Sequence, residues 1–562
     1  MGFVNPFARG KHDRDYPDVV IPIARRTSLS SPPEKTENNM TSNDTGSEAD
    51  MSTGGYSIES LKKEVDGDVA TEGLNTAYDR KSKVINKAIQ DMGMGRYQWE
   101  LFVLCGFGWF ADNLWLQGVA LTLDPIAAEF NVDTNRVRYT TLSLFVGLCI
   151  GASFWGIASD VIGRRLAFNC TLMFAGIFGL AAGGGPNWIG TCALYACLGL
   201  GVGGNLPVDG ALFLEFLPFE SGNLLTLLSV WWPIGQLVSS LLAWAFIPNY
   251  SCPSTATTCT KAENWGWRYL VLTLGALTFV MFLCRFFLFH LYESPKFLLS
   301  RGKQREAVAV VHAIAHKNGH KTWLTEEVLN QVGGDPEVVQ DGALSTVDIV
   351  KRSLAKFSTQ RVGPLFHTWK LAVTTILIWF MWTTIGMGYP LFNAFLPQYL
   401  ANSGGGAATP TSIVYRNYAI TSIVGVPGSI LACYTVDIKY IGRKGTMVIS
   451  TLITGVFLFL FTTSTDSGAQ LAFSSLEAFF QNIMYGVLYA YTPEVFPAPS
   501  RGTGTGIASF LNRVAGLCAP IVAVNAGQAN PSGPVYAAGG LFFAAFVAMC
   551  LLPIETRGRQ SL

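Results

Sequence analysis

Twelve apolar stretches, each near the length of a membrane-spanning helix, occupy most of the chain after residue 98. A helix of about 20 residues crosses the hydrocarbon core of a bilayer, and backbone polar groups in lipid must find their partners within the segment. The sequence therefore predicts an all-α membrane protein with twelve transmembrane helices. The stretches run approximately over residues 99–121, 139–159, 167–184, 189–214, 224–247, 269–291, 370–394, 417–436, 446–463, 470–491, 503–524 and 535–553.

Composition excludes an ordinary soluble enzyme. Of the 562 residues, 50% are hydrophobic and 14% are charged, whereas soluble domains carry about 25% charged residues. The formal net charge is +1, so no strong field attracts nucleic acid, and we expect no nucleic-acid partner. Nine of the eleven cysteines lie in apolar stretches without the spacing of a metal site. We expect no metal, no cofactor and no enzymatic activity, since no catalytic triad or cofactor-binding loop occurs.

Three polar motifs occur twice and in the same order, which indicates an internal duplication. The first copies are Asp160-Val-Ile-Gly163-Arg164-Arg165, Glu215-Phe-Leu-Pro218 and Glu293-Ser-Pro-Lys296. The second copies are Asp437 followed by Gly442-Arg443-Lys444, Glu494-Val-Phe-Pro497 and Glu555-Thr-Arg-Gly558. Each motif follows an even-numbered stretch, so the pattern predicts two six-helix repeats of the same topology. This arrangement is typical of secondary transporters.

The polarity of the remaining segments predicts the domain boundaries. Residues 1–97 carry too few apolar side chains to offset the entropy of ordering, and we expect a disordered cytoplasmic tail. The two six-helix bundles are expected at residues 98–292 and 369–556, with a cytoplasmic central loop at 293–368 and a cytoplasmic C-terminus at 557–562. The tail has no apolar signal-peptide segment, so we expect the first membrane helix to direct insertion.

Lysine and arginine residues gather on one side of the predicted bundle, which sets the expected orientation. Arg164, Arg165, Arg443, Lys444 and Arg501 all follow even-numbered stretches, and the central loop is basic as well. Loops rich in these residues stay in the cytoplasm. We therefore expect an integral, multi-pass protein of the plasma membrane with both termini in the cytoplasm.

Several motifs resemble those of the major facilitator superfamily, and of its sugar porters in particular. They are Gly156-Ile-Ala-Ser-Asp160 with Gly163-Arg164-Arg165, the segment from Glu293 to Lys303, and Pro493-Glu-Val-Phe-Pro497. Within the superfamily the chain is most similar to the synaptic vesicle glycoprotein 2-related branch, including its fungal-type members. The residues that carry this similarity include Trp109-Phe-Ala-Asp112, Gly203-Gly204-Asn-Leu-Pro207 and Asn512-Arg513. The resemblance implies the major facilitator fold and solute transport, but it does not transfer a substrate.

Two ionisable residues lie deep within predicted spans, where burial is expensive and therefore informative. Asp112 lies near the middle of the first span, and we interpret it as a proton-coupling carboxylate or substrate ligand, with a structural partner as the alternative. Arg513 lies deep in the eleventh span, where it could meet an anionic substrate or an internal acid. Many sugar porters carry an arginine where this chain has Tyr195, so we expect no such basic partner beside Asp112.

Further polar and aromatic residues within the spans are candidates for a central solute site. In the first half they are Asn205, Asp209, Trp232 and Gln236, and in the second half Tyr389, Asn393, Gln481 and Asn482. Aromatic faces next to amides suit a ring-bearing or polyhydroxylated solute. Helix packing is the alternative explanation for any one of them, and the role of Asp209 is left open.

The repeated charged motifs predict a gate at the cytoplasmic side. Its candidate residues are Asp160, Arg164, Arg165, Glu215, Asp437, Arg443, Glu494 and Arg501. Charge pairs on cytoplasmic turns, and acids facing helix N-termini, can hold one state of a switching protein. The alternative is that the basic residues only mark topology.

The two remaining cysteines, Cys252 and Cys259, lie together in a polar loop on the expected outer side, which predicts a disulfide. The expected partners are a small solute (a carboxylate, a sugar or another organic ion), protons and the lipid bilayer. We expect a secondary active transporter that works by alternating access and is coupled to protons. A facilitative uniporter and a non-transporting nutrient sensor are the alternatives.

Overall fold

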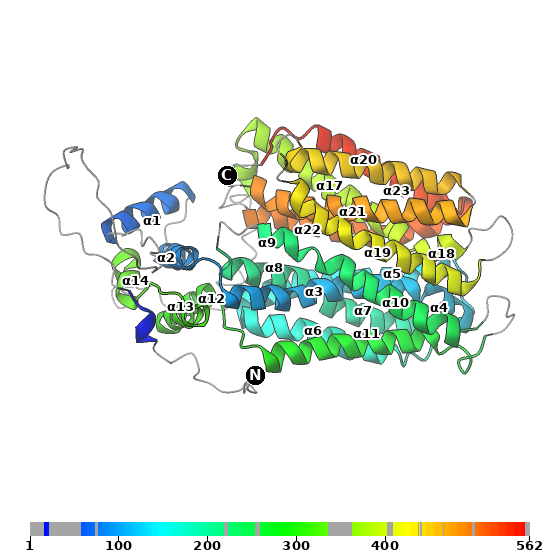
Figure 1. Cartoon of the computed structure of the whole chain (residues 1–562), viewed down its shortest axis with the longest axis horizontal. Coiled ribbons are helices and arrows are strands. Elements are labelled where there is room, and N and C mark those ends of the chain that lie inside the picture. Colours follow the sequence, from blue (N-terminus) through cyan, green and yellow to red (C-terminus); the bar gives the residue numbers. More distant parts are fainter. Residues whose placement is uncertain are drawn as a thin grey trace, which may run out of the picture.

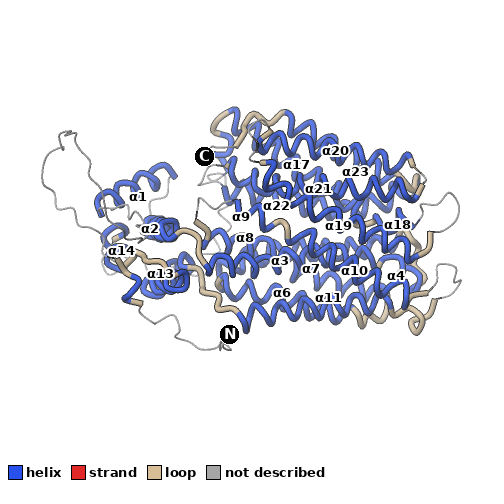
Figure 2. The backbone as a smooth tube through the Cα atoms, in the orientation of Figure 1, coloured by secondary structure: helices blue, strands red, loops and turns tan. Residues whose placement is uncertain are grey.

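The computed structural model places two helical bundles side by side, with a smaller helical module at one end (Figure 1). The structure describes residues 16–21, 58–72, 77–218, 223–252, 259–334, 362–401, 409–436, 438, 441–464, 466–496 and 501–556. Within these residues the secondary structure is helical, and one isolated bridge joins Val20 to Thr322 (Figure 2). The expectation of an all-α protein is thus confirmed.

The first bundle, called the first half below, contains the predicted spans of residues 98–292. Its helices are α3 (Arg96–Leu121), α4 (Leu123–Phe130), α5 (Tyr139–Ile162), α6 (Arg164–Ala182), α7 (Trp188–Gly203), α8 (Asn205–Phe216), α9 (Asn223–Leu228), α10 (Trp231–Tyr250) and α11 (Gly266–Leu283). A π-helical turn at Cys284–Leu288 continues α11. The fourth predicted span is divided between α7 and α8 at Gly204, and the fifth between α9 and α10.

The second bundle, the second half, contains the predicted spans of residues 369–556. Its helices are α17 (Trp369–Asn393), α18 (Leu396–Ala401), α19 (Thr411–Thr435), α20 (Gly442–Thr463), α21 (Ser467–Val495), α22 (Arg501–Ala529) and α23 (Gly533–Cys550). The two halves meet where α5 packs on α22 and α10 packs on α19. The second span of each repeat therefore packs on the fifth span of the other repeat.

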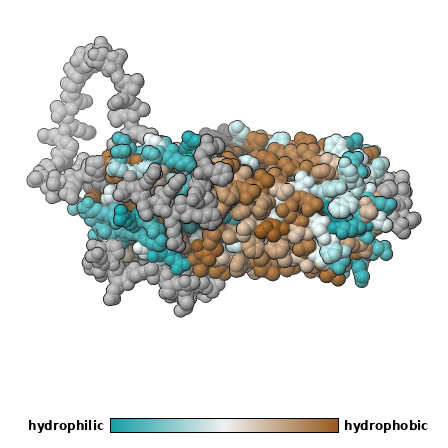
Figure 3. Space-filling view, turned by 90° about the horizontal axis from the view of Figure 1, so that it is seen from below, coloured by the Kyte–Doolittle hydropathy of each residue, from teal (hydrophilic) through white to brown (hydrophobic). Residues whose placement is uncertain are grey.

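Nine helical segments in the described part of the chain are long and apolar enough to cross a membrane. The other three predicted spans coincide with α3, α10 and α21, which are long but carry polar residues such as Asp112, Gln236 and Glu477. Figure 3 shows an apolar belt around the middle of the molecule and polar surface at both ends. The three less apolar helices carry much of the polar interior described below, and their crossing of the membrane stays a prediction.

The disulfide between Cys252 and Cys259 is present, with the two residues seven positions apart in sequence. It follows α10, at the end of the bundles opposite the helical module. We call this the disulfide end. The opposite end, where α6 begins with Arg164 and α20 begins with Gly442, is called the basic end.

The prediction that residues 1–97 are disordered is wrong for the part nearest the membrane. This part contains α1 (Ile58–Glu72) and α2 (Ala77–Met92), which pack on each other and on α14 (Glu326–Gly333) of the central loop. The apolar side chains of α2 recur at helical spacing and are buried, which is the signal that overall polarity conceals. These side chains are Val84, Ile85, Ala88, Ile89 and Met92.

The central loop supplies the rest of this module through α12 (Pro295–Ser300), α13 (Gln304–Asn318) and α14. Trp323 Nε1 donates to Asp91 Oδ2 at 2.8 Å, which joins the loop to α2. Asn318 Oδ1 accepts from the Tyr97 backbone N–H at 2.9 Å, and Lys317 pairs with Glu100, so α13 is fastened to the start of α3. The module is thus attached to the first half.

Candidate functional site

Asp112 lies at the centre of the molecule, fully buried on α3. Its Oδ2 accepts a hydrogen bond from Trp232 Nε1 of α10 at 2.9 Å. Its Oδ1 lies 3.6 Å from Arg513 Nη2 of α22, so the ion pair joins the two halves. Asp112 therefore has a basic partner, and Arg513 meets an internal acid, which was one of the two alternatives stated for it. The arginine comes from the eleventh span, whereas Tyr195 lies elsewhere, with its hydroxyl 3.3 Å from Thr122 Oγ1.

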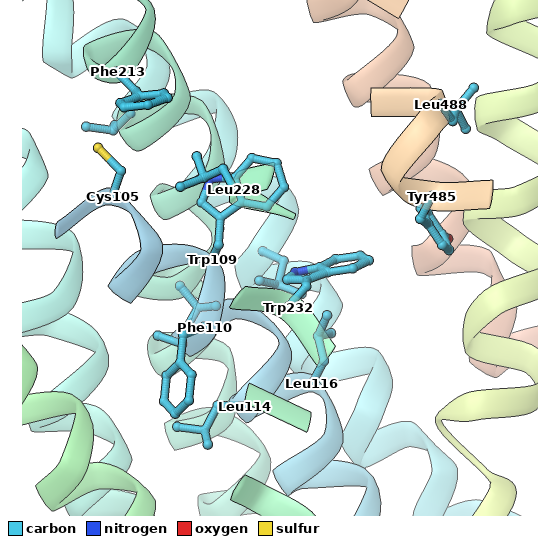
Figure 4. Packing of buried hydrophobic residues seen from close by; sticks show 14 of the residues in the cluster. Cys105, Trp109, Phe110, Leu114, Leu116, Phe213, Leu228, Trp232, Tyr485 and Leu488 are labelled. Carbon is cyan, nitrogen blue, oxygen red and sulfur yellow. The ribbon is translucent and has the colours of Figure 1, made fainter. Parts of the chain in front are cut away.

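An aromatic cluster surrounds this pair and draws side chains from both halves. The Trp232 ring stacks on Tyr389 at 5.9 Å between centroids and meets Tyr485 edge-on at 5.3 Å. Tyr489 contacts Trp109 at 5.3 Å and Trp382 at 4.8 Å. In Figure 4, Trp232 from the first half points toward Tyr485 of the second. The predicted candidates Trp232 and Tyr389 are thus brought together.

Amide side chains on α3 continue the site toward the disulfide end. Gln117 Nε2 donates to the Tyr389 hydroxyl at 2.7 Å, and that hydroxyl donates to Asn113 Oδ1 at 3.2 Å. The Tyr418 hydroxyl of α19 donates to Gln117 Oε1 and also contacts the predicted residue Gln236. The sequence analysis missed Asn113, Gln117 and Tyr418, although both amides follow Asp112 within one span.

A second polar chain lies wholly within the second half. Asn393 Nδ2 of α17 donates to Gln481 Oε1 of α21 at 3.0 Å, and Gln481 Nε2 donates to Glu477 Oε1 at 2.7 Å. Glu477 is fully buried. Asn393 and Gln481 were both predicted, whereas Glu477 was missed. The predicted residue Asn482 does not take part in this hydrogen-bond chain. Its Nδ2 donates instead to the Ala478 carbonyl of its own helix, α21.

Asp209 has an internal partner within the first half. Its Oδ2 lies 2.7 Å from Arg285 Nη2, and both side chains are fully buried. Arg285 also donates to the carbonyls of Leu104 and Phe168, which satisfies the rest of its guanidinium. Asn205 Nδ2 makes a long contact of 3.5 Å to the Gly108 carbonyl. Asp209 therefore has an internal cationic partner, which favours a structural role over a role in solute binding.

The predicted gate residues form one charge cluster in each half at the basic end. In the first half Arg164 pairs with Asp160 at 2.6 Å and with Glu215 at 3.3 Å. In the second half Arg443 pairs with Glu494 at 2.6 Å. Each of these ion pairs joins residues of one half. Asp437 and the Arg501 side chain lie outside the described residues.

Two further acids, which the sequence showed only as repeated landmarks, complete these clusters. Glu293 accepts hydrogen bonds from the backbone N–H groups of Arg164 and Arg165 at the start of α6. Glu555 does the same for Arg443 and Lys444 at the start of α20. An acid at a helix N-terminus is stabilised by the helix dipole. Burial nevertheless raises the pKa of the Glu293 carboxyl, which the backbone donors partly counteract.

At the disulfide end, hydrogen bonds join the two halves directly. Arg138 of the first half donates to Gln398 Oε1 at 3.0 Å and to the Ala523 carbonyl at 2.8 Å, both in the second half. The Tyr415 hydroxyl donates to the Leu121 carbonyl at 2.8 Å. These bonds close the disulfide end between the halves.

Several buried polar atoms near the centre have no hydrogen-bond partner within the described residues. They are Trp109 Nε1, Asp112 Oδ1, Asn205 Oδ1, Glu477 Oε2 and Asn512 Oδ1. Buried polar groups are normally satisfied, so such a group calls for a specific explanation. Together with the aromatic faces, these atoms could bind an organic solute through both polar and apolar contacts.

Comparisons with known proteins agree with this architecture. A family model described as sugar (and other) transporter matches residues 97–561. The MFS siderochrome iron transporter 1 of Ceriporiopsis subvermispora (strain B) is 47% identical over 490 residues, covering 87% of this chain and 93% of that protein. The synaptic vesicle 2-related protein of Xenopus laevis is 26% identical over 495 residues, covering 85% of this chain and 82% of that protein.

Among solved structures, the MFS proton:xylose symporter XylE bound to 6-bromo-6-deoxy-D-glucose has a similar fold. The TM-score is 0.59 at 18% sequence identity, and the match covers 83% of this chain and 98% of that chain. The matches confirm the resemblance drawn from the motifs, including that to the synaptic vesicle 2-related proteins. The family and these relatives are transporters and not enzymes. The chain belongs to the sugar (and other) transporter family of the major facilitator superfamily, whose members are integral membrane proteins.

Proposed function

We propose that this protein is a secondary active transporter that moves a small polar or charged organic solute by alternating access, coupled to protons. The observation that carries the proposal is the buried Asp112–Arg513 pair, which joins the two halves at 3.6 Å. Unpartnered polar atoms and aromatic rings from both halves lie around it. A solute bound there would contact both halves, so its binding would depend on how they are arranged.

The distribution of bonds between the halves supports alternating access. Arg138 and Tyr415 fasten the halves together at the disulfide end, whereas the ion pairs of Arg164 and Arg443 at the basic end stay within one half. This pattern suits a state that is closed at the disulfide end. Transport would require these bonds to break while the basic end closes.

Asp112 is the proposed proton carrier, as the sequence suggested, and Arg513 adds a switch. While Asp112 is ionised, the ion pair holds α3 to α22. Protonation removes the negative charge and weakens that link, so proton binding would favour rearrangement of the halves. Because Arg513 has an acid partner, its role in an internal salt bridge is favoured over direct binding of an anionic substrate.

We place the protein in the plasma membrane, with the basic end and both termini in the cytoplasm. This orientation follows from the basic residues, because loops rich in lysine and arginine stay on the cytoplasmic side. In this orientation the disulfide lies on the oxidising, outer side. The apolar belt in Figure 3 is the surface that would contact lipid.

Flux measurements in proteoliposomes test this proposal. We would measure uptake of a ferric siderochrome and of D-xylose, the solutes in the names of two similar proteins, with an acidic exterior. Asp112→Asn, which imitates the protonated acid, should abolish accumulation against the gradient but preserve exchange of labelled solute. A variant that still accumulates solute would assign the coupled proton to another acid, whereas an unaltered protein that only equilibrates solute would indicate facilitated diffusion. Binding without flux in the unaltered protein would favour the nutrient sensor.

A further inference from the structure

Asp112, Asp209 and Glu477 are the fully buried acids of the described spans, and Glu477 differs from the other two because it has no cationic partner. Asp209 pairs with Arg285, Glu129 with Arg268 and Asp112 with Arg513. Glu477 is equally buried, but within the described residues no lysine, arginine or histidine lies within 4.0 Å of its carboxylate. Its Oε1 accepts from Gln481, whereas Oε2 is buried and has no hydrogen-bond partner in the part of the chain that the structure describes.

A carboxylate in this position is costly to bury without a cation. Gln481 and Asn393 are neutral, so they orient the carboxylate without balancing its charge. The Asp112–Arg513 pair carries no net charge. When Glu477 is ionised, the central site therefore holds one uncompensated negative charge, and that charge belongs to the second half.

Aromatic rings extend from this carboxylate toward the centre. Four side chains of α21 recur at four-residue spacing, which places them along one helix face. They are Glu477, Gln481, Tyr485 and Tyr489. The Glu477 carboxylate also interacts electrostatically with the phenols of Tyr389 and Tyr418. Ring faces attract cations, and quaternary ammonium groups in particular.

We propose that Glu477, with the rings of Tyr389, Tyr418 and Tyr485, forms a subsite for the cationic nitrogen of the transported solute, an ammonium or quaternary ammonium group. This inference rests on the proposed transport function and names its substrate class. The cationic nitrogen of the solute would bind Glu477 Oε2, and its positive charge would compensate the negative charge of the carboxylate. Tyr389 is held to α3 through Gln117 and Asn113. Movement of the halves would therefore separate Tyr389 from α3 and open the subsite.

The test compares two probes of the same shape and different charge, choline and its neutral analogue 3,3-dimethylbutan-1-ol. Purified full-length protein is titrated with each probe, and binding is measured from the thermal unfolding midpoint and from tryptophan fluorescence. We expect choline to stabilise the protein and the neutral analogue to have no effect. Glu477→Gln should weaken choline binding at least tenfold, because the amide keeps the shape and removes the charge.

Glu306→Gln is the matched control, because Glu306 is an exposed residue of the module that pairs with Lys303. This variant should bind choline as tightly as the unaltered protein does. If Glu477→Gln fails to fold, Glu477→Asp keeps the charge and should still prefer choline to the neutral analogue. Equal binding of the two probes by the unaltered protein, or full choline binding by Glu477→Gln, would overturn the subsite.

The same preparation separates this inference from the transport proposal. Charge-dependent choline binding without flux in proteoliposomes would sustain the subsite and contradict transport. Flux of D-xylose or a siderochrome that is unaltered in Glu477→Gln, with no preference for choline, would sustain transport and contradict the subsite.

Discussion

The two halves of the protein are alike at the basic end and unlike at the centre. At the basic end each half has an arginine that forms an ion pair with an acid of the same half. Each half also has a second acid, Glu293 or Glu555, that accepts hydrogen bonds from the backbone at a helix N-terminus. At the centre the first half balances its buried acid Asp209 with Arg285. In the described residues of the second half, no cation pairs with Glu477. Under the proposed function, the duplicated parts would serve the movement of the halves, and the unmatched centre would determine solute selectivity.

The largest effect is expected from unbalancing the first half. Arg285→Ala leaves Asp209 buried without its cation, and breaking such a pair costs about 3–5 kcal/mol. We expect a strongly lowered unfolding midpoint in purified protein. The double variant Asp209→Ala with Arg285→Ala should regain part of the loss. An unchanged midpoint for Arg285→Ala alone would show that the first half does not depend on this pair.

A smaller loss should follow from removing the disulfide, which belongs to a loop of the first half. Replacing Cys252 and Cys259 by serine should lower the free energy of unfolding by about 2 kcal/mol, since the closed loop is short. Cys550→Ser, at an exposed free cysteine, is the control. Reaction of both loop cysteines with a membrane-impermeant thiol reagent before any reduction would contradict the bond.

Alanine at two glycines tests the likeness of the basic ends. Gly163 has φ +107° and Gly442 has φ +61°, and a Cβ at Gly163 would lie 2.7 Å from Glu293 Oε2. Each alanine variant should destabilise by about 1–3 kcal/mol, with Gly163→Ala the more affected. Gly156→Ala, where a Cβ meets nothing within 4 Å, should be neutral or stabilising in the same melting assay. Destabilisation by only one of the two alanine substitutions would contradict the likeness of the basic ends of the two halves.

The smallest effect, and one of opposite sign, is expected at the centre of the second half. Glu477→Gln removes an unbalanced carboxyl and should raise the free energy of unfolding without ligand by about 1 kcal/mol. Asp209→Asn, the equivalent change in the first half, should lower it because Arg285 loses its counter-charge. Melting curves of both variants in one buffer provide the measurement. A change of the same sign in the free energy of unfolding for both variants would contradict the proposed difference between a paired Asp209 and an unpaired Glu477.

Helix positions could be predicted because span length and apolarity depend only on local sequence. The repeated motifs likewise placed Arg164 and Arg443 in equivalent clusters, and the isolated pair Cys252 and Cys259 was predicted from the loop. Partners distant in sequence could not be predicted in this way. Arg513 meets Asp112 only because the fold brings α22 and α3 within reach of these two side chains.

Other omissions had a signal that was present but unused. Glu477 and Arg285 are ionisable residues within predicted spans, and the criterion that identified Asp112 applies equally to them. The helix α2 was missed because the average polarity of residues 1–97 hides a buried apolar stripe that includes Val84 and Ile89. Periodicity within a polar segment carries information that its composition does not.

The attachment of the helical module to the first half has a mechanical consequence. Asn318 and Lys317 fasten α13 to the start of α3, and Arg301 donates to the Val161 carbonyl at the end of α5. If the halves move as proposed, a module held in this way would turn together with the first half. Its far end, at α1 and α14 (Figure 1), would then travel farther than the helices in the membrane. A small tilt of the first half inside the bilayer would thus become a large displacement in the water beside it.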